Sequence, residues 1–282
     1  MIAVIDAATA VFEAAASGGA IVVITGAGVS VESGIRPYRG VGGRWTEEGA
    51  SAMKKATASY FVRHPEESWA WHLDRRSEVL AAAPNRAHDA VALLEASLGD
   101  RFTLITQNID RLHLRAGGTP ERTIELHGHL DGMRCSGGCE GIVAVPEAVH
   151  GWETGDSIGA EHLEVLVCPV CGLVTRPHVL WFDEFYDEEH YGIVTAQRAV
   201  ADASVCITVG TSGGVPIAER LASIAIKAGA MLIDVNPNDN ELRHLALQCG
   251  GMAVYETASA AMPLIAESQR KFVGMGKRGS SE

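Results

Sequence analysis

The feature that most constrains the fold is a short apolar run that ends in a glycine-rich turn. Residues 20–25 read AIVVIT, and Gly26, Ala27 and Gly28 follow directly. A continuous run of β-branched residues is typical of a strand covered on both faces. Glycine after such a strand permits a sharp turn and brings the backbone close to a bound phosphate. By itself the turn is ambiguous, because ordinary tight turns give the same string and Val31 breaks the G-x-G-x-x-G spacing.

The same kind of strand recurs along the chain, with helical segments between the copies. Further apolar runs lie at residues 101–106, 203–209 and 230–235. Helical periodicity is present at residues 6–17, 86–98, 193–202 and 216–228. Strands that alternate with helices form a parallel sheet with helices on both faces. The sequence therefore predicts an α/β protein with a doubly wound, Rossmann-like parallel sheet.

Charge and hydropathy exclude several classes of protein. The chain has 23 Lys and Arg against 35 Asp and Glu, a formal charge of −12, whereas a general nucleic-acid binder needs a basic face. The opening MIAVIDAATA lacks the basic start of a secretory signal, and the apolar strings are too short to cross a bilayer. We therefore expect a cytoplasmic protein with no membrane partner and no direct nucleic-acid partner. In that compartment, cysteines are metal ligands or buried thiols rather than disulfides.

Four of the six cysteines form two close pairs. Cys135 and Cys139 make a C-x-x-x-C pair, and Cys168 and Cys171 make a C-x-x-C pair. Two such pairs of thiolates supply the four ligands of a tetrahedral Zn²⁺ ion. Since no further ligand is evident, we expect a closed, structural site with one zinc per chain. The alternatives are two unrelated thiol pairs or a redox-active C-x-x-C.

Candidate ligand-binding residues, most of them polar, follow three of the predicted strands. They are Gln107, Asn108, Ile109 and Asp110 after the second strand, Gly210, Thr211 and Ser212 after the third, and Asn236 after the fourth. The carboxyl ends of parallel strands share one edge, where open α/β sheets bind ligands. Each segment alone also fits a helix N-cap or a plain turn. His127, which precedes Gly128, is the candidate general base because an imidazole titrates near neutral pH.

These segments, in this order, closely resemble the sirtuin family of NAD-dependent protein-lysine deacylases. The matching strings are GAGVSVESGIRPYRG, TQNIDRLHLRAG, ELHGHL, RPHVLWFDE, GTSGGVPIA and DVNP, which extend from about residue 20 to residue 237. The resemblance implies an NAD-binding Rossmann-like domain formed by residues 1–36, 86–130 and 177–267. It further implies a helical module with a cofactor loop at 37–85 and a zinc-binding module at 131–176. Residues 268–282 are expected to form a disordered tail.

The resemblance also implies roles for individual residues. By similarity, the pyrophosphate of NAD would be held by Gly26, Ala27, Gly28 and Ser30, and the nicotinamide ribose would be covered by Tyr38 and Arg39. The nicotinamide pocket would be lined by Gln107, Asn108, Ile109 and Asp110. The adenosine half would be held by Gly210, Thr211, Ser212 and Asn236. Asp110 would bind the carboxamide, and Cys135, Cys139, Cys168 and Cys171 would bind a structural zinc. His127 and Asn108 are the implied catalytic residues.

The implied reaction transfers an acyl group from lysine to ADP-ribose. The amide oxygen of the acyl-lysine attacks the ribose carbon as nicotinamide leaves, and His127 then takes a proton from a ribose hydroxyl. Val179, Trp181 and Phe182 would form an edge strand and tunnel for a protein substrate in extended conformation. Backbone pairing tolerates many sequences, so we expect broad substrate choice, and we expect a monomer.

Alternative functions remain open at the level of sequence. The same scaffold suits protein mono-ADP-ribosylation or NAD hydrolysis. Another alternative is a zinc-ribbon interaction module with a vestigial nucleotide fold. The presence of Asn108, Asp110 and His127 argues against it, because a vestigial site does not need all three residues. A hydride-transferring dehydrogenase fits poorly, because the glycine loop lacks G-x-G-x-x-G and the cysteine module has no role there.

Three departures from the family pattern bear on specificity. The cofactor loop reads Gly34-Ile35-Arg36-Pro37-Tyr38-Arg39 where the family commonly has Gly-Ile-Pro-Asp-Phe-Arg, so its proline has moved. In sirtuins that prefer malonyl or succinyl groups, a Tyr-x-x-Arg pair binds the acyl carboxylate, and here His72 and Arg75 stand at those positions. We expect Arg75 to bind the carboxylate in a bidentate contact and His72 to make that recognition weaker or pH-dependent. The loop after Ser212 is one residue shorter than usual.

Overall fold

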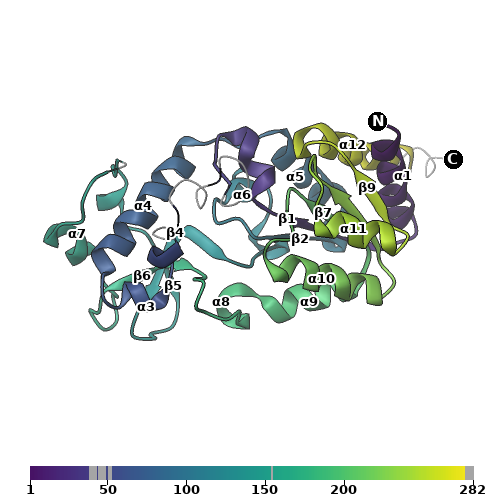
Figure 1. Cartoon of the computed structure of the whole chain (residues 1–282). Helices are drawn as coiled ribbons and strands as arrows, with labels where there is room; N and C mark the ends of the chain where they lie inside the picture. The colour runs from purple at the N-terminus through teal and green to yellow at the C-terminus, as the bar shows by residue number, and fades with distance from the viewer. Residues whose placement is uncertain (38–42, 44–48, 50–52, 154, 277–282) are drawn as a thin grey trace.

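The protein is described here from a computed structural model that covers residues 1–37, 43, 49, 53–153 and 155–276, with side chains up to residue 268. The chain forms a larger lobe around a parallel sheet and a smaller lobe around an antiparallel sheet (Figure 1). The predicted residues Tyr38 and Arg39 lie outside the described residues.

The larger sheet has six strands, all parallel to their neighbours, in the order β3-β2-β1-β7-β8-β9. They are β1 (Ala20–Thr25), β2 (Phe102–Thr106), β3 (Thr123–Glu125), β7 (Ala203–Val209), β8 (Met231–Val235) and β9 (Met252–Val254). The order reverses between β1 and β7, which is the topological switch point of a doubly wound sheet. The predicted Rossmann-like fold class is confirmed.

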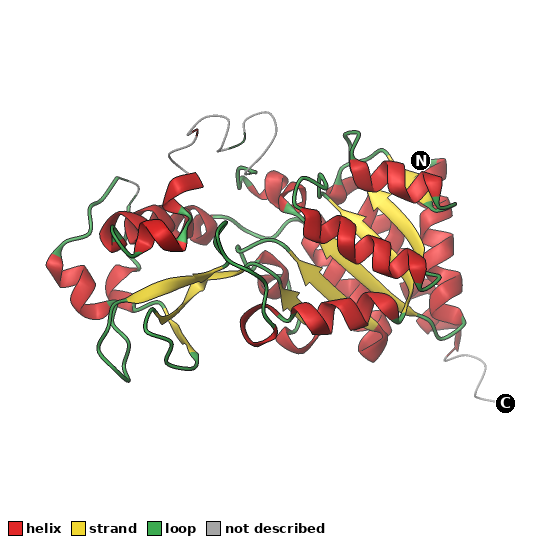
Figure 2. Ribbon diagram, turned by 60° about the horizontal axis from the view of Figure 1, so that its bottom comes forward, coloured by secondary structure: helices red, strands yellow, loops and turns green. Residues whose placement is uncertain are grey.

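Helices cover both faces of this sheet (Figure 2). Alternate residues of β1 divide between two cores: Ile21 and Val23 pack on one face, and Val22 and Ile24 on the other. The first face is covered by α1 (Ile2–Ala16), α5 (Arg86–Leu98) and α12 (Ala258–Gly276), and the second by α9 (Ile193–Ala201), α10 (Pro216–Lys227) and α11 (Glu241–Gln248). Burial on both faces explains why the strands are continuously apolar.

The smaller lobe combines an antiparallel sheet with helices from an earlier part of the chain. Its strands are β4 (Gly128–Cys135), β5 (Ile142–Ala144) and β6 (Thr175–Val179), in the order β5-β4-β6, and its helices are α3 (Ala58–Phe61), α4 (Pro65–Ala81) and α7 (Ala160–Val165). One aromatic core joins the two parts, with Trp69 and Trp71 from α4 packed among Met133, Trp152 and Trp181. The cysteine region therefore shares a hydrophobic core with the helical region.

Short elements complete the described part of the chain. They are the helices α6 (Leu112–Arg115) and α8 (Glu188–Tyr191) and the 3₁₀ helices η1 (Ala27–Ser33), η2 (Gly99–Arg101), η3 (Pro120–Arg122) and η4 (Glu147–Val149). None of the described helices combines the length and apolar character that a bilayer crossing requires.

Several element ends differ from those expected. The first helix begins at Ile2 rather than residue 6, because Val4 also packs in the core beside Ala7 and Val11. Strands β4 and β6 run across the expected module boundaries at 130/131 and 176/177, since they pair with each other as one sheet. Helix α12 continues to Gly276, beyond the expected start of the tail at 268.

Candidate active site

Two glycine loops meet at the switch point of the parallel sheet. The Gly28 amide, in η1 after β1, donates a 2.8 Å hydrogen bond to the carbonyl of Gly210, which follows β7. A Cβ on Gly28 would lie 2.6 Å from the Gly210 oxygen, and Gly210 has a φ of +60°. Only glycine at both positions allows the two backbones to approach this closely. The result is an open strand edge at the place where doubly wound sheets bind nucleotides.

A buried polar network begins at Ser30, beside this edge. The Ser30 hydroxyl donates a 2.7 Å hydrogen bond to Oδ2 of Asp110 and accepts a 3.2 Å bond from the amide of Asn108. The same Asn108 amide donates to the Gly26 carbonyl at 3.2 Å. His88 Nε2 lies 3.3 Å from the Ser30 hydroxyl. The network thus connects the loops that follow β1 and β2 with the first turn of α5.

The Asp110 carboxyl group is held in a buried position at the centre of this network. Burial raises its pKa, whereas the backbone amide of Leu112 and the Ser30 hydroxyl lower it by donating hydrogen bonds. A buried carboxylate needs such donors because it has lost its water. The remaining acceptor capacity of this group suits an amide N–H donor on a ligand.

A second set of contacts lies on the other side of the switch point. Gln107 donates from its side-chain amide to Thr25 O at 3.2 Å and to Thr211 Oγ1 at 3.1 Å. Asn236, after β8, donates to the Thr211 carbonyl at 3.0 Å. Ser212 is exposed and accepts from the Gly214 amide. The structure therefore brings three of the predicted strand-end segments together at one edge.

His127 lies between β3 and β4, at the same edge. Its Nδ1 is 2.7 Å from the backbone oxygen of Gln107, and its Nε2 is 2.9 Å from the hydroxyl of Tyr186. A carbonyl oxygen only accepts, so Nδ1 carries the proton and Nε2 holds the lone pair. Burial lowers the pKa of His127 to about 4, and the Gln107 carbonyl opposes that shift. The imidazole is therefore a neutral base at pH 7.

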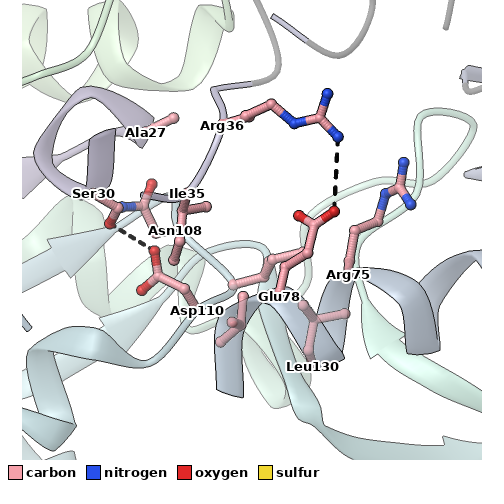
Figure 3. Close-up of a pocket in the computed structure, with 11 residues that line it drawn as sticks. Ala27, Ser30, Ile35, Arg36, Arg75, Glu78, Asn108, Asp110 and Leu130 are labelled. Carbon is pink, nitrogen blue, oxygen red and sulfur yellow. Dashed lines mark hydrogen bonds and ion pairs between the residues drawn. The ribbon is translucent and has the colours of Figure 1, made fainter. Parts of the chain in front are cut away.

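A pocket joins this edge to helix α4 of the smaller lobe. Figure 3 shows Asn108 and Asp110 on one side of it and Arg36, Arg75 and Glu78 on the other. The nearest guanidinium nitrogen of Arg36 is 3.8 Å from the Glu78 carboxylate. The Arg75 guanidinium carbon lies 3.6 Å from the Trp71 ring centre, and Arg75 is only 5% exposed. The pocket is thus lined by two guanidinium groups, of Arg36 and Arg75, and by two carboxyl groups, of Glu78 and Asp110.

His72 was expected to make carboxylate recognition weaker or pH-dependent, and its position in the structure leaves it no free ring nitrogen for a carboxylate. Its Nδ1 is 2.7 Å from the Ser68 carbonyl, and its Nε2 accepts a 3.3 Å hydrogen bond from the Trp181 indole. Both ring nitrogens are therefore used within the protein. Burial lowers the pKa of His72 to about 3, so the ring stays neutral across the physiological range. Sequence alone did not reveal this, because the burial of His72 depends on Trp181, which is distant along the chain.

The predicted peptide segment has mixed exposure. Val179 ends β6, an edge strand of the smaller sheet, and it pairs in register with Gly128. Trp181 is 2% exposed and stacks on the Arg176 guanidinium, whereas Phe182 is 50% exposed. Trp181 therefore belongs to the aromatic core of the smaller lobe, whereas Val179 packs in a separate apolar cluster with Val79 and Leu130. Phe182 faces solvent.

The four cysteines of the two predicted pairs form one cluster in the smaller lobe. The Sγ atoms of Cys135, Cys139, Cys168 and Cys171 all lie within 4.8 Å of one another. The Cys135 and Cys171 sulfurs are 3.5 Å apart. A tetrahedral zinc with Zn–S bonds of about 2.3 Å requires sulfurs about 3.8 Å apart, so the donor set fits Zn²⁺. The alternative of two unrelated thiol pairs is excluded by this proximity.

Three residues of the site were not identified from the sequence. His88 had a local signal, because Asn85 and His88 form a capping box at the start of α5. For Glu78 and Tyr186 the only sequence signal was their position next to predicted segments. Glu78 follows Arg75 by one helical turn, and Tyr186 lies two residues after the RPHVLWFDE string. Their contacts arise only when separate elements come together.

The sequence is similar to known proteins along most of its length. The model of the Sir2 family matches residues 26–216. An NAD-dependent protein deacylase of Thermus thermophilus is 38% identical over 243 residues, which cover 83% of this chain and 88% of that protein. NAD-dependent protein deacylase 1 of Pseudomonas aeruginosa is 37% identical over 243 residues, covering 85% and 92%.

Solved structures agree with these similarities. A mutant Sir2 homologue in complex with ADP-ribose has a TM-score of 0.75 and 34% identity, with 90% of this chain and 93% of that chain covered. A Sir2 homologue bound to NAD has a TM-score of 0.72 and 32% identity, with 90% of each chain covered. A Sir2 mutant with a deacetylated p53 peptide and 3′-O-acetyl ADP-ribose has a TM-score of 0.70 and 27% identity, with 88% and 92% covered.

Proposed function

The chain belongs to the Sir2 family, the sirtuins, and on that basis we propose that it is an NAD-dependent protein-lysine deacylase. The products are nicotinamide, O-acyl-ADP-ribose and the free lysine. The observation that carries the proposal is His127, a neutral base whose lone pair lies at the same strand edge as the Ser30–Asn108–Asp110 network. The relatives reported above are named deacylases, so mono-ADP-ribosylation and NAD hydrolysis are not favoured.

The residues of the edge have distinct tasks in this proposal. Gly28 and Gly210 leave room for the pyrophosphate, and Thr211 with Asn236 lies on the adenosine side. Asp110 accepts a hydrogen bond from the carboxamide N–H of nicotinamide. Asn108 holds the loop that carries Asp110, through its hydrogen bonds to Gly26 and Ser30. His127 Nε2 takes a proton from a ribose hydroxyl once nicotinamide has left. Tyr38 and Arg39 keep their proposed place over the nicotinamide ribose.

The acyl group would enter the pocket beside α4. We propose that Arg75 binds the carboxylate of a succinyl or malonyl group, since a guanidinium matches a carboxylate with two parallel hydrogen bonds. Arg36 supports this preference by pairing with Glu78, whose carboxylate would otherwise repel that of the acyl group in the same pocket. An acetyl group needs no such partner and fits the apolar side formed by Ile35, Ile109 and Leu130.

Peptide, metal and location complete the proposal. A protein substrate would add an extended strand beside β6, which is an edge strand. The four thiolates would hold a structural zinc that ties the end of β4, through Cys135 and Cys139, to the loop that carries Cys168 and Cys171. Free thiolates persist in a reducing compartment, which supports a cytoplasmic location. We further propose a monomer organised as the Rossmann-like domain, helical module and zinc module described above.

The proposal is tested by following matched acetyl-lysine and succinyl-lysine peptides by mass spectrometry, with and without NAD. Deacylation predicts NAD-dependent loss of an acyl group with an equal amount of nicotinamide released. Nicotinamide release without a peptide would replace deacylation by NAD hydrolysis. Transfer of ADP-ribose to the peptide or the protein, with the acyl group intact, would replace it by ADP-ribosylation.

A further inference from the structure

The hydroxyl of Tyr186 lies against the catalytic nitrogen of His127. Its oxygen is 2.9 Å from Nε2, within hydrogen-bond distance, and the two ring centres are 6.0 Å apart. Since Nδ1 of His127 carries the proton that binds Gln107, Nε2 has only a lone pair to offer. The Tyr186 hydroxyl is therefore the donor. Its hydrogen bond engages the Nε2 lone pair, which in the proposed reaction accepts the proton of the ribose hydroxyl.

We propose that Tyr186 is a cap on the base: its hydroxyl binds the lone pair of His127 Nε2 until a ribose hydroxyl of the substrate takes its place. This inference rests on the proposed function, because it concerns how the same base is engaged. It assigns Tyr186 as a positioning residue that acts through His127. In the capped state the imidazole is held by two hydrogen bonds in the tautomer that the reaction needs.

Contacts of the residues before and after Tyr186 in the chain hold its phenol ring in place. Two residues earlier, the Glu184 carboxylate forms an ion pair with Arg176 and accepts the amide of Trp181. One residue later, Asp187 caps α8 by accepting the amide of His190 at 2.6 Å. The Tyr186 ring itself packs against the core that contains the α9 and α10 side chains. Figure 1 shows α8 where the two lobes meet.

The cap has a thermodynamic consequence for nucleotide binding. A ribose hydroxyl that reaches Nε2 must break the Tyr186 hydrogen bond before it forms its own. A site without the phenol hydroxyl offers the lone pair without this competition. Exchange of one neutral hydrogen bond corresponds to a change of about two- to tenfold in affinity. Removal of the hydroxyl is therefore expected to tighten binding, which is the opposite of losing an ordinary ligand contact.

The experiment compares ADP-ribose binding, measured by calorimetry, in the wild type and in Tyr186→Phe. The cap predicts that Tyr186→Phe binds ADP-ribose about two- to tenfold more tightly. The matched control is Tyr191→Phe, which removes a phenol hydroxyl in the neighbouring helix α8 that accepts from Arg134 instead of facing His127. Its affinity should equal that of the wild type. Equal or weaker binding by Tyr186→Phe would overturn the cap.

Two further measurements separate the cap from general effects on the fold and from the proposed function. In the His127→Ala background, Tyr186→Phe should leave ADP-ribose affinity unchanged; a change of the same size there would refute a role through His127. The nitrogen NMR shift of His127 Nε2 should move toward that of a free acceptor in Tyr186→Phe, and an unchanged shift would also refute the cap. If the wild type bound no ADP-ribose, the proposed function would fail, while this shift would still decide whether the phenol binds Nε2.

Discussion

The backbone amide of Gly28 donates a 2.8 Å hydrogen bond to the carbonyl of Gly210. This contact joins the two glycine loops at the sheet edge where the nucleotide is proposed to bind. The two residues belong to different loops, after β1 and after β7, and neither has a side chain that could separate them. Because doubly wound sheets bind the pyrophosphate at this switch point, the contact determines how close a phosphate can come to the backbone.

Replacement of Gly28 by alanine should damage this edge. The added Cβ would lie 2.6 Å from the Gly210 oxygen, so one loop must move. We expect a loss of about 1–3 kcal/mol in the free energy of unfolding, as for other overpacked sites, and at least tenfold weaker ADP-ribose binding. Gly151→Ala is the control, since no heavy atom lies within 4 Å of its Cβ position. Normal ADP-ribose affinity in Gly28→Ala would show that the close approach does not matter.

Replacement of His127 should remove catalysis but keep the nucleotide site. We expect His127→Ala to lower kcat/KM for deacylation by about 10²–10⁴-fold, the usual contribution of a general base. ADP-ribose affinity should change by less than tenfold, because most contacts of the edge come from other loops. Steady-state assays and calorimetry measure the two effects separately. Retention of wild-type kcat/KM would exclude His127 as the base.

The Arg75 guanidinium in the pocket beside α4 should control acyl preference. Arg75→Met is expected to lower kcat/KM for succinyl-lysine peptides by about 10–100-fold, since a hydrogen bond to a charged group contributes about 1.5–3 kcal/mol. Deacetylation should fall far less. Glu78→Gln is the matched opposite change: it removes the carboxylate that faces Arg36 in the pocket and should favour the succinyl peptide. Desuccinylation unaffected by Arg75→Met would refute the assignment of Arg75.

Removal of the metal should unfold the smaller lobe before the parallel sheet. The cluster is expected to hold one zinc per chain, and Cys171→Ser should reduce the zinc content measured by atomic absorption and lower the unfolding temperature. Cys249→Ser is the control because Cys249 is exposed and lies outside the cluster. A full zinc complement in Cys171→Ser would contradict the four-cysteine site.

Acid should destabilise the fold through its buried imidazoles. Burial lowers the pKa of His178 to about 3 and of His129 to about 4. Their contribution to stability is complete above the unfolded pKa, about 6.5, and is lost as pH falls toward the folded values, because the unfolded chain then binds more protons. For His178 this amounts to roughly 3–5 kcal/mol.

Urea unfolding between about pH 7.5 and pH 4.5 measures this dependence. His178→Phe removes one titrating imidazole while keeping a ring beside Tyr191, so the free energy of unfolding should fall less steeply with pH. An identical slope in wild type and His178→Phe would show that this imidazole does not contribute.

The sequence by itself determined the elements and the residue types of the site. Strands 20–25 and 203–209 and helix 86–98 have the same bounds in the structure as expected from the sequence, because continuous β-branched runs and capping residues are local signals. The four cysteines were also readable from spacing alone, since two close pairs already supply the ligands of one ion. His127 and the strand-end loops followed from chain order and from resemblance to a family.

Only the tertiary structure decided which of these side chains remain available. His72 stands at the position expected for a carboxylate ligand, yet Trp181 and Ser68 use both of its nitrogens. His127 was expected to act as the general base, and in the structure the Tyr186 hydroxyl lies 2.9 Å from its Nε2. The physical reason is common to both cases. A hydrogen bond between elements far apart in sequence depends on how their loops and helices pack, and no local pattern of residues encodes that distance.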